Sequence, residues 1–129
     1  IKASKTKVRE RFFNYFFIQY QSKIYIQKRT EKDIWQNLYE LPLIESDKLF
    51  EPEEIGTNDL FASINAIDIN SNTATFKHIL SHQRIFARFF TIIVSNKNDN
   101  LKQLIEINIT ELDNYAVSRL TSLFLETIN

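Results

Sequence analysis

The sequence contains no cysteine, no methionine, one glycine and two prolines in 129 residues. Without cysteine, the chain can form no disulfide, no thiolate metal site and no cysteine-ligated iron–sulfur cluster of its own. A single glycine excludes the glycine-rich phosphate loops of nucleotide-binding proteins. Because the chain starts at Ile1 and holds no methionine to start translation, we expect it to be a piece of a longer protein.

Long apolar runs are also missing. No stretch approaches the roughly 20 apolar residues that a membrane-spanning helix needs, and no signal-peptide pattern opens the chain. Lys and Arg together number 16, and Asp and Glu also number 16, so the formal net charge is zero. We therefore expect no membrane association, and any contact with nucleic acid must come from a local patch of cations.

The residues that are present indicate one folded domain with a substantial core. Hydrophobic residues make up 43% of the chain, and 11 residues are Phe. The segment RFFNYFFIQY (11–20) places apolar side chains on both faces, which is typical of a strand covered on both sides. A short turn, QSK (21–23), leads to KIYIQKRT (23–30), which we interpret as the partner strand of a hairpin.

The rest of the chain predicts further strands and two helices. Residues 30–42 end at Pro42 and indicate a loop with a short extended piece, and the acidic segment 45–60 is expected to be a mobile connection. A helix is predicted at 58–67, capped by Asn58 or Asp59, and a turn at 70–73. Two strands follow at 73–80 and 84–94, broken near Ser81–Gln83, and a second turn is predicted at 95–100. The last predictions are a strand or helix entry at 104–109, a capping box at 110–113 and an amphipathic helix at 117–128. This order indicates an α+β fold or a mixed-sheet sandwich.

The stretch FKHILSHQRIFARFF (76–90) gathers both histidines and three cations without an acidic residue. It allows three interpretations: a solvated face of a strand, a surface for a protein partner, or a contact with nucleic acid in which cations bind phosphates. His78 and His82 lie four residues apart, a spacing that pairs metal ligands on a helix. Here the surrounding pattern is strand and turn, so we do not expect the two imidazoles to converge on a metal.

The acidic segment EPEEIG (51–56) resembles the end of the Nudix box, G-x5-E-x7-R-E-U-x-E-E-x-G-U, in which U is a bulky aliphatic residue and helix carboxylates hold Mg²⁺. Three residues match: Glu53, Glu54 and Gly56. Leu49 and Phe50 stand at the Arg-Glu positions, and Pro52 would interrupt the catalytic helix. The simpler interpretation of this segment is a solvated acidic loop.

Three segments, in order, resemble the C-terminal domain of the adenine DNA glycosylases, the MutY family. RTEKDIWQNLYELP (29–42) is similar to R-P-x-x-G-[LI]-W-x-G-L-[WY]-E-[FL]-P, FKHILSHQRI (76–85) to K-H-x-[FL]-[ST]-H, and YAVSRLTSLFLE (115–126) to the closing segment. The matches run from about Arg29 to Leu125. The departures are Asp33 and Asn37 at two family glycines, Leu80 at a common aromatic position and Ser118 at an expected proline.

The resemblance implies an α+β, Nudix-like mixed β-sheet sandwiched by helices, without a functional Nudix box, over a single domain at 1–129. In the family this domain recognises 8-oxoguanine mispaired with adenine in duplex DNA. A separate N-terminal domain with an iron–sulfur cluster excises the adenine. The resemblance therefore implies a monomeric, intracellular, DNA-associated fragment that is not itself an enzyme and holds no cofactor, and whose partners are that catalytic domain and the damaged duplex.

The resemblance also directs attention to one turn. 8-Oxoguanine carries an N7–H donor and a C8 carbonyl, and a serine hydroxyl can accept from the first and donate to the second. The candidate lesion-recognition residues are Leu80, which would supply an apolar contact, Ser81, and His82, which would bind a phosphate or wedge beside the lesion. The candidate DNA-backbone residues are Lys77, His78, Gln83 and Arg84.

Two other functions stay open on the sequence alone. One is a divergent Nudix hydrolase of oxidised nucleotides, against which the missing box residues argue. The other is a protein-interaction module that uses the acidic segment 45–60. For Trp35, core packing beside Leu38, Tyr39 and Leu41 is the simpler interpretation, and stacking on a base is the alternative.

Overall fold

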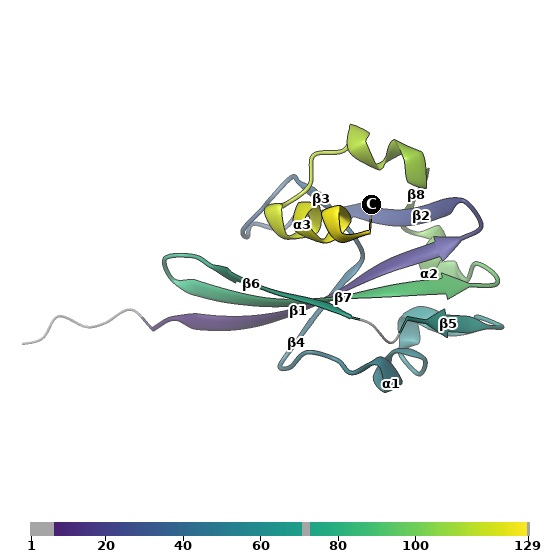
Figure 1. Ribbon diagram of the computed structural model, residues 1–129, viewed down its shortest axis with the longest axis horizontal. Helices are drawn as coiled ribbons and strands as arrows, with labels where there is room; N and C mark the ends of the chain where they lie inside the picture. Colours follow the sequence, from purple (N-terminus) through teal and green to yellow (C-terminus); the bar gives the residue numbers. More distant parts are fainter. Residues whose placement is uncertain (1–6, 71–72, 129) are drawn as a thin grey trace, which may run out of the picture.

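Two long strands form the centre of the molecule in a computed structural model that describes residues 7–70 and 73–128 (Figure 1). β1 (Arg9–Tyr20) and β7 (Gln83–Val94) run parallel, from Arg9 opposite Gln83 to Gln19 opposite Ile93. Alternate residues of β1 enter two different cores, because successive side chains of a strand point to opposite faces. The predicted strand with both faces covered is therefore confirmed.

The other strands extend this pair into a mixed sheet. β2 (Lys23–Lys28) follows β1 through the predicted short turn and pairs with it antiparallel. On the outer edges of the sheet, β3 (Tyr39–Glu40) and β8 (Ile105–Asn108) pair with β2, β4 (Leu43–Ser46) pairs with β1, and β5 (Ile67–Ile69) and β6 (Ala74–Ile79) pair with β7. In the part of the chain that the structure describes, the result is an eight-stranded mixed sheet.

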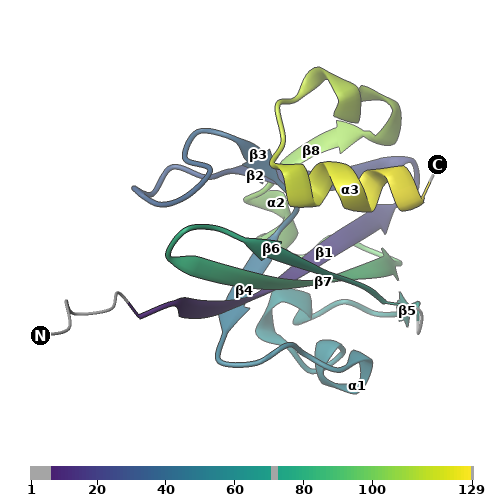
Figure 2. The same cartoon turned by 60° about the vertical axis from the view of Figure 1, so that its left-hand side comes forward.

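Short helices cover the two faces of the sheet (Figures 1 and 2). α3 (Arg119–Thr127) packs on one face through Leu120 and Phe124. The other face is covered by α1 (Pro52–Ile55), the 3₁₀ turn η1 (Asp59–Phe61) and α2 (Asp99–Lys102). A second 3₁₀ segment, η2 (Ile109–Asn114), connects β8 toward α3. The predicted α+β architecture, a mixed sheet between helices, is confirmed.

Stacked aromatic rings fix α3 to the sheet. The Phe89 ring lies between two others, with centroids 4.6 Å from Tyr15 and 4.5 Å from Phe124, and both pairs are nearly parallel. All three side chains are buried. Stacking in offset geometry adds to the free energy gained from burying their area. The stack therefore joins β1, β7 and α3 into one core.

The predicted helix at 58–67 is wrong beyond its first turn. Asn58 does cap it, since its side chain accepts from the backbone N–H of Leu60. The structure then makes a single 3₁₀ turn, Asp59–Phe61, because Asn98 donates to the carbonyls of Leu60 and Ala62, which would otherwise accept helical bonds. Residues further on enter β5 instead.

The predicted capping box at 110–113 is displaced by two residues. The N-cap is Asn108, and Glu111 accepts from its backbone N–H at 2.9 Å. The turn at 95–100 also gives way to α2 at Asp99, capped by Asn98. Part of the predicted turn at 70–73 lies outside the described residues. Of the two alternatives at 104–109, a strand or a helix entry, the structure forms the strand, and the helix at 117–128 is confirmed within two residues at each end.

The acidic segment 45–60 is held against the sheet by one buried side chain. Asn14, on β1, accepts from the backbone N–H of Phe50 at 2.7 Å and donates to the carbonyl of Ile44 at 3.1 Å. The segment contains the end of β4 and the whole of α1. It is therefore structured in this part, where the sequence indicated only a connection.

No helix among residues 7–70 and 73–128 combines the length and the apolar character that crossing a bilayer requires.

Candidate nucleic-acid interface

The predicted Ser81–His82 turn forms the tip of a β-hairpin. β6 and β7 pair up to Ile79 opposite Arg84, and the backbone N–H of Leu80 donates to the carbonyl of Gln83 at 2.8 Å. Ser81 and His82 are left as a two-residue turn, and both are exposed. The hairpin and the start of β1 project together from the body of the molecule (Figures 1 and 2). The break predicted between these two strands is confirmed.

The neighbouring strand β1 holds this turn from the side. The backbone N–H of Arg9 donates to the carbonyl of His82 at 3.0 Å. Because β1 continues in register along the whole of β7, the turn is fixed at both ends to a three-stranded platform. A turn held in this way presents its side chains in a defined direction, which is what specific recognition of a ligand needs.

Strand alternation separates the other candidate residues into two groups. His78, Leu80 and Gln83 share the side of the hairpin that carries the α3 core, whereas Lys77 and Arg84 point to the opposite side. Leu80 is half-buried against that core. The sequence showed these residues as one basic stretch, but the structure gathers only Ser81 and His82 at the tip itself.

Trp35 supports the first of these sides. Its ring contacts the His78 imidazole edge-on, with centroids 5.7 Å apart, and lies 6.3 Å from the Phe13 ring. Trp35 is half-buried and packs against the core, as the simpler interpretation of the sequence expected. The loop between β2 and β3 therefore contacts the β6–β7 hairpin through Trp35 and His78.

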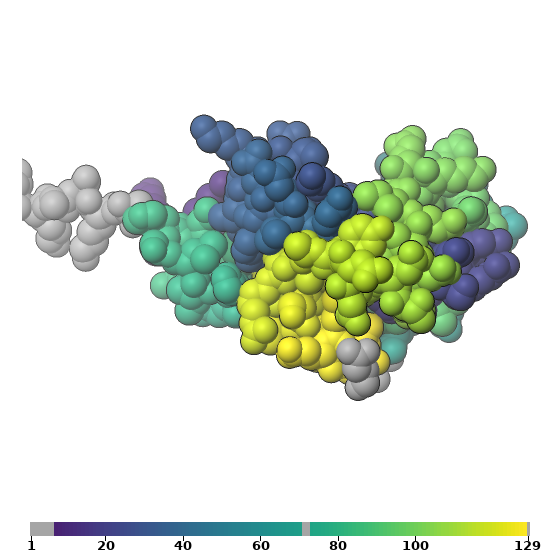
Figure 3. Space-filling model, turned by 90° about the horizontal axis from the view of Figure 1, so that it is seen from above, coloured from purple at the N-terminus to yellow at the C-terminus, as the bar shows by residue number. Residues whose placement is uncertain are grey.

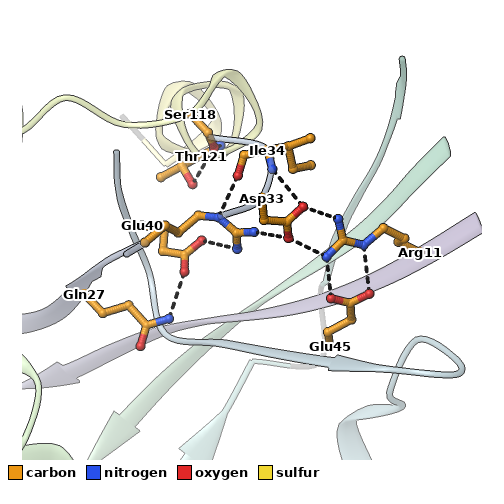
Figure 4. Close-up of polar contacts among 9 residues, drawn as sticks. Arg11, Gln27, Asp33, Ile34, Glu40, Glu45, Ser118 and Thr121 are labelled. Atoms are coloured by element: carbon orange, nitrogen blue, oxygen red, sulfur yellow. Dashed lines mark hydrogen bonds and ion pairs between the residues drawn. The ribbon is translucent and has the colours of Figure 1, made fainter. Parts of the chain in front are cut away.

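The structure contains an ion-pair cluster centred on Arg11, which the sequence did not predict (Figure 4). The Arg11 side chain is 5% exposed and donates in bidentate fashion to Asp33, at 2.8 and 2.7 Å, and to Glu45, at 2.9 and 2.7 Å. It also donates to Oε1 of Gln83 at 3.1 Å. Arg11 thus joins β1, the β2–β3 loop, β4 and the first residue of β7.

Asp33 extends this cluster to a second arginine. Its Oδ2 accepts from Arg29 at 2.8 Å, and Arg29 also pairs with the buried Glu40 at 3.2 Å. Hydrogen bonds from Arg11 hold the pKa of Asp33 down to about 2 and lower the pKa of Glu45. Burial acts in the opposite direction on Glu40 and raises its pKa. Asp33 and Glu45 are therefore ionised partners of Arg11 at neutral pH.

The two positions that differ from the family glycines have distinct structural roles. Asn37 has φ 71, in the left-handed region that Asn tolerates better than most other residues. Asp33 supplies the carboxylate between Arg11 and Arg29 instead.

One signal in the sequence could have indicated Arg11. It is the single cation within RFFNYFFIQY, and its alternation with Phe13 and Tyr15 places it on a face that is otherwise buried.

The remnant of the Nudix box lies on α1, which is four residues long and starts at Pro52. Glu54 accepts from the backbone N–H of Glu51 at 3.0 Å and pairs with Lys48 at 3.1 Å. It therefore caps its own helix. In the part of the chain that the structure describes, no three His, Asp or Glu side chains are grouped so that they could hold a metal ion.

The fold and these segments define a domain of the Nudix type. The model of the NUDIX domain family matches residues 14–127, so the chain belongs to that family. A search of curated proteins found no match to this sequence.

Solved structures agree with this fold. The C-terminal domain of mouse MUTYH, crystallised in complex with human PCNA, superposes with a TM-score of 0.64 and 12% sequence identity, over 92% of this chain and 86% of that one. RenU, a Nudix hydrolase from M. smegmatis, superposes with a TM-score of 0.57 and 7% identity, over 93% of this chain and 83% of that one. At these identities the likeness concerns the fold alone.

Proposed function

We propose that this domain recognises 8-oxoguanine mispaired with adenine in duplex DNA, and that the Ser81–His82 turn reads the damaged base. The observation that carries the proposal is the position of this turn at the exposed tip of a hairpin that β1 clamps at the carbonyl of His82. The likeness to the C-terminal domain of MUTYH and the K-H-x-x-S-H pattern at 77–82 support the same function.

The chemistry assigns a role to each exposed group. The Ser81 hydroxyl accepts from N7–H of 8-oxoguanine and donates to its C8 carbonyl, neither of which guanine can match. His82 binds a phosphate or wedges beside the lesion. Lys77 and Arg84, both exposed, hold flanking phosphates from one side of the hairpin, which fixes the register of the protein on DNA.

The other candidate residues act less directly in this proposal. The Gln83 side chain accepts a hydrogen bond from Arg11, and the His78 ring packs against Trp35. Both can contact the DNA backbone only in the orientation that these partners impose. Leu80 offers the lesion only the part of its side chain that the core leaves free.

The domain works as a helper in this proposal and carries no catalytic group or cofactor of its own. A catalytic domain of the same parent protein, with its iron–sulfur cluster, excises the adenine inside the cell. Tethering two modules raises the effective concentration of each for the same DNA, so weak binding by this domain suffices.

Ser81→Ala tests the assignment. One good base contact gives about 1–3 kcal/mol of discrimination, so the preference for 8-oxoguanine:adenine over guanine:adenine should fall by a factor of roughly 5 to 150. Affinity for the undamaged duplex should stay the same, because phosphate contacts are intact. NMR titration of the labelled domain with the two short duplexes measures both quantities at the weak affinity expected.

Ser22→Ala is the matched control, since Ser22 is an exposed serine in the two-residue turn at the opposite end of β1. It should change neither affinity. If Ser81→Ala weakens binding to damaged and undamaged duplexes equally, the turn holds phosphates and does not read the base.

Membership of the NUDIX domain family favours one alternative, hydrolysis of oxidised nucleotides. This function predicts Mg²⁺-dependent release of pyrophosphate from 8-oxo-dGTP. Glu53→Gln, which removes one of the two matching carboxylates of the Nudix box, should then abolish the release. Because Glu54 is engaged with Glu51 and Lys48, we expect no such release from this chain.

A further inference from the structure

The hairpin that carries the reading turn also has a free edge. Among the described residues, β6 pairs with β7 and with no other strand. The backbone of Leu80 faces β7, so the alternation of an antiparallel ladder turns the backbone groups of Thr75, Lys77 and Ile79 away from β7. An open edge of this kind is a template for a further strand.

The same three residues are exposed on one side of the sheet. Ile79 is 67% exposed, the most of the large exposed hydrophobic side chains in the described chain. In register with these residues lie Arg84 and the stacked pair of Phe86 and Phe12, whose centroids are 5.3 Å apart. This side therefore combines an open backbone edge with an apolar centre and exposed cations.

Space around the edge permits a partner. The turn end of the hairpin extends beyond α3 in the view from above (Figure 3). α3 packs against the opposite side of β6, through the core that contains Phe76. Neither side chains of α3 nor those of that core cover the side that carries Ile79 and Lys77.

We propose that the edge of β6 binds an extended, acidic segment of a partner protein by strand addition. Main-chain hydrogen bonds to Thr75, Lys77 and Ile79 supply affinity, and alternate side chains supply specificity. The segment carries an apolar residue beside Ile79 and, two positions away on the same face, an acidic residue beside Lys77. This spacing follows from the two-residue period of a strand.

Charge and packing favour this occupant over two others. A second copy of the chain, paired edge to edge, would bring Lys77 and Arg84 close to the same cations of its partner. A nucleobase could stack on Phe86 only by displacing contacts that this ring already makes. Phe86 stacks on Phe12, and the Lys77 ammonium lies 5.5 Å from the centroid of the Phe86 ring. An acidic peptide meets the cations without disturbing that stack.

The probe is a synthetic nine-residue peptide, blocked at both ends, that alternates Ile and Glu along one face. In an NMR titration of the labelled protein, the largest shifts are expected at the amides of Thr75, Lys77 and Ile79. N-methylation of the peptide amides that face β6 should abolish binding, because it removes the donors of strand addition. A peptide with Lys in place of Glu should bind at least ten-fold more weakly.

Ile79→Thr should also weaken binding about ten-fold while keeping the strand propensity and the fold. The matched control is Ile93→Thr, an exposed isoleucine at the far end of β7, which should leave binding unchanged. Lys77 is shared with the proposed DNA contact, so the test uses Ile79 and the backbone, and Ser81→Ala should leave peptide binding intact. A failure of this proposal is thereby distinguished from a failure of lesion reading.

Three results would overturn the proposal. The first is a failure of the peptide test, either because nothing binds at millimolar peptide or because N-methylation and Ile79→Thr leave binding unchanged. The second is a shift of the same amides on dilution without peptide, which would assign the edge to a second copy. The third is a loss of duplex affinity on Ile79→Thr with no response to peptide, which would assign this side to DNA.

Discussion

Arg11 shows how much a single residue can organise in this protein. Its guanidinium is nearly buried and satisfies two carboxylates and the side chain of Gln83. Removing one partner of such a cluster leaves the other charges without compensation, which costs more than the intact cluster contributes. Through Gln83, the cluster is connected to the end of the Ser81–His82 turn, although Arg11 itself touches no ligand in the proposed function.

We expect Arg11→Met to lower the free energy of unfolding by about 2–3 kcal/mol, below the 3–5 kcal/mol of fully buried pairs, because Asp33 and Glu45 retain some contact with water. Urea denaturation at neutral pH measures the change. Arg84→Met, at an exposed position of the same hairpin, is the control and should stay within about 0.5 kcal/mol. Equal losses in both variants would contradict the role of the cluster.

The same cluster predicts how stability depends on pH. The pKa of Asp33 falls from 3.8 to about 2 on folding, so its contribution is present above about pH 4 and is lost as the pH falls through about 2. The pKa of Glu45 shifts in the same direction. The difference in stability between the native protein and Arg11→Met should therefore shrink between pH 4 and pH 2, and a constant difference in acid would argue against ion pairing.

At the level of elements, hydrophobic periodicity predicted the long strands and the last helix. RFFNYFFIQY and RIFARFFTIIV are apolar on both faces, and burial between two helical layers is what such a pattern requires. The helix expected at 58–67 failed because Asn98, nearly forty residues later, occupies its carbonyls, and a local pattern carries no trace of that contact.

The candidate site was predictable to a similar extent. The turn at Ser81–His82 follows from local sequence, since two apolar strands flank a short polar break. The sequence could not show that Lys77 and Arg84 lie on the side facing away from the α3 core, whereas His78 and Gln83 lie on the side that carries it. That assignment requires knowing which face of the hairpin is covered. The Arg11 cluster joins four segments distant in sequence, so only the tertiary structure reveals it.

The aromatic stack makes α3 an integral element of the fold. Phe124→Ala should lower the free energy of unfolding by about 3–5 kcal/mol, because it removes a buried ring from contact with Phe89 and Phe17. Thermal and urea unfolding measure the loss. Leu123→Ala, at a half-buried position of the same helix, is the control, with about 1 kcal/mol expected. Similar losses in both variants would show that helix propensity, and not the stack, holds α3.

The molecule as a whole has a formal net charge of zero. In the proposed function, affinity for DNA can therefore not come from a general positive field and must come from the few cations of the hairpin. This distribution suits a recognition module that must not bind every duplex it meets.

We predict a shallow salt dependence. Two phosphate contacts, by Lys77 and Arg84, give a slope of about −2 in a plot of log affinity against log salt, from about −0.9 per contact on B-DNA. Fluorescence anisotropy with a labelled 8-oxoguanine:adenine duplex, at several salt concentrations, measures the slope. Arg84→Gln should reduce it by about 1, and a slope of −5 or steeper would reveal contacts beyond the hairpin.

The parallel pairing of β1 with β7 also governs the order in which this chain can fold. Within this domain β1 is synthesised before the other described strands, whereas β7, its long parallel partner, is synthesised only after β2 to β6. Pairing between segments so far apart is slow, and until it occurs a strand rich in Phe and Tyr lacks its main partner. The parallel pair of β1 and β7, which holds the Ser81–His82 turn through Arg9, can therefore form only after β7 has been synthesised.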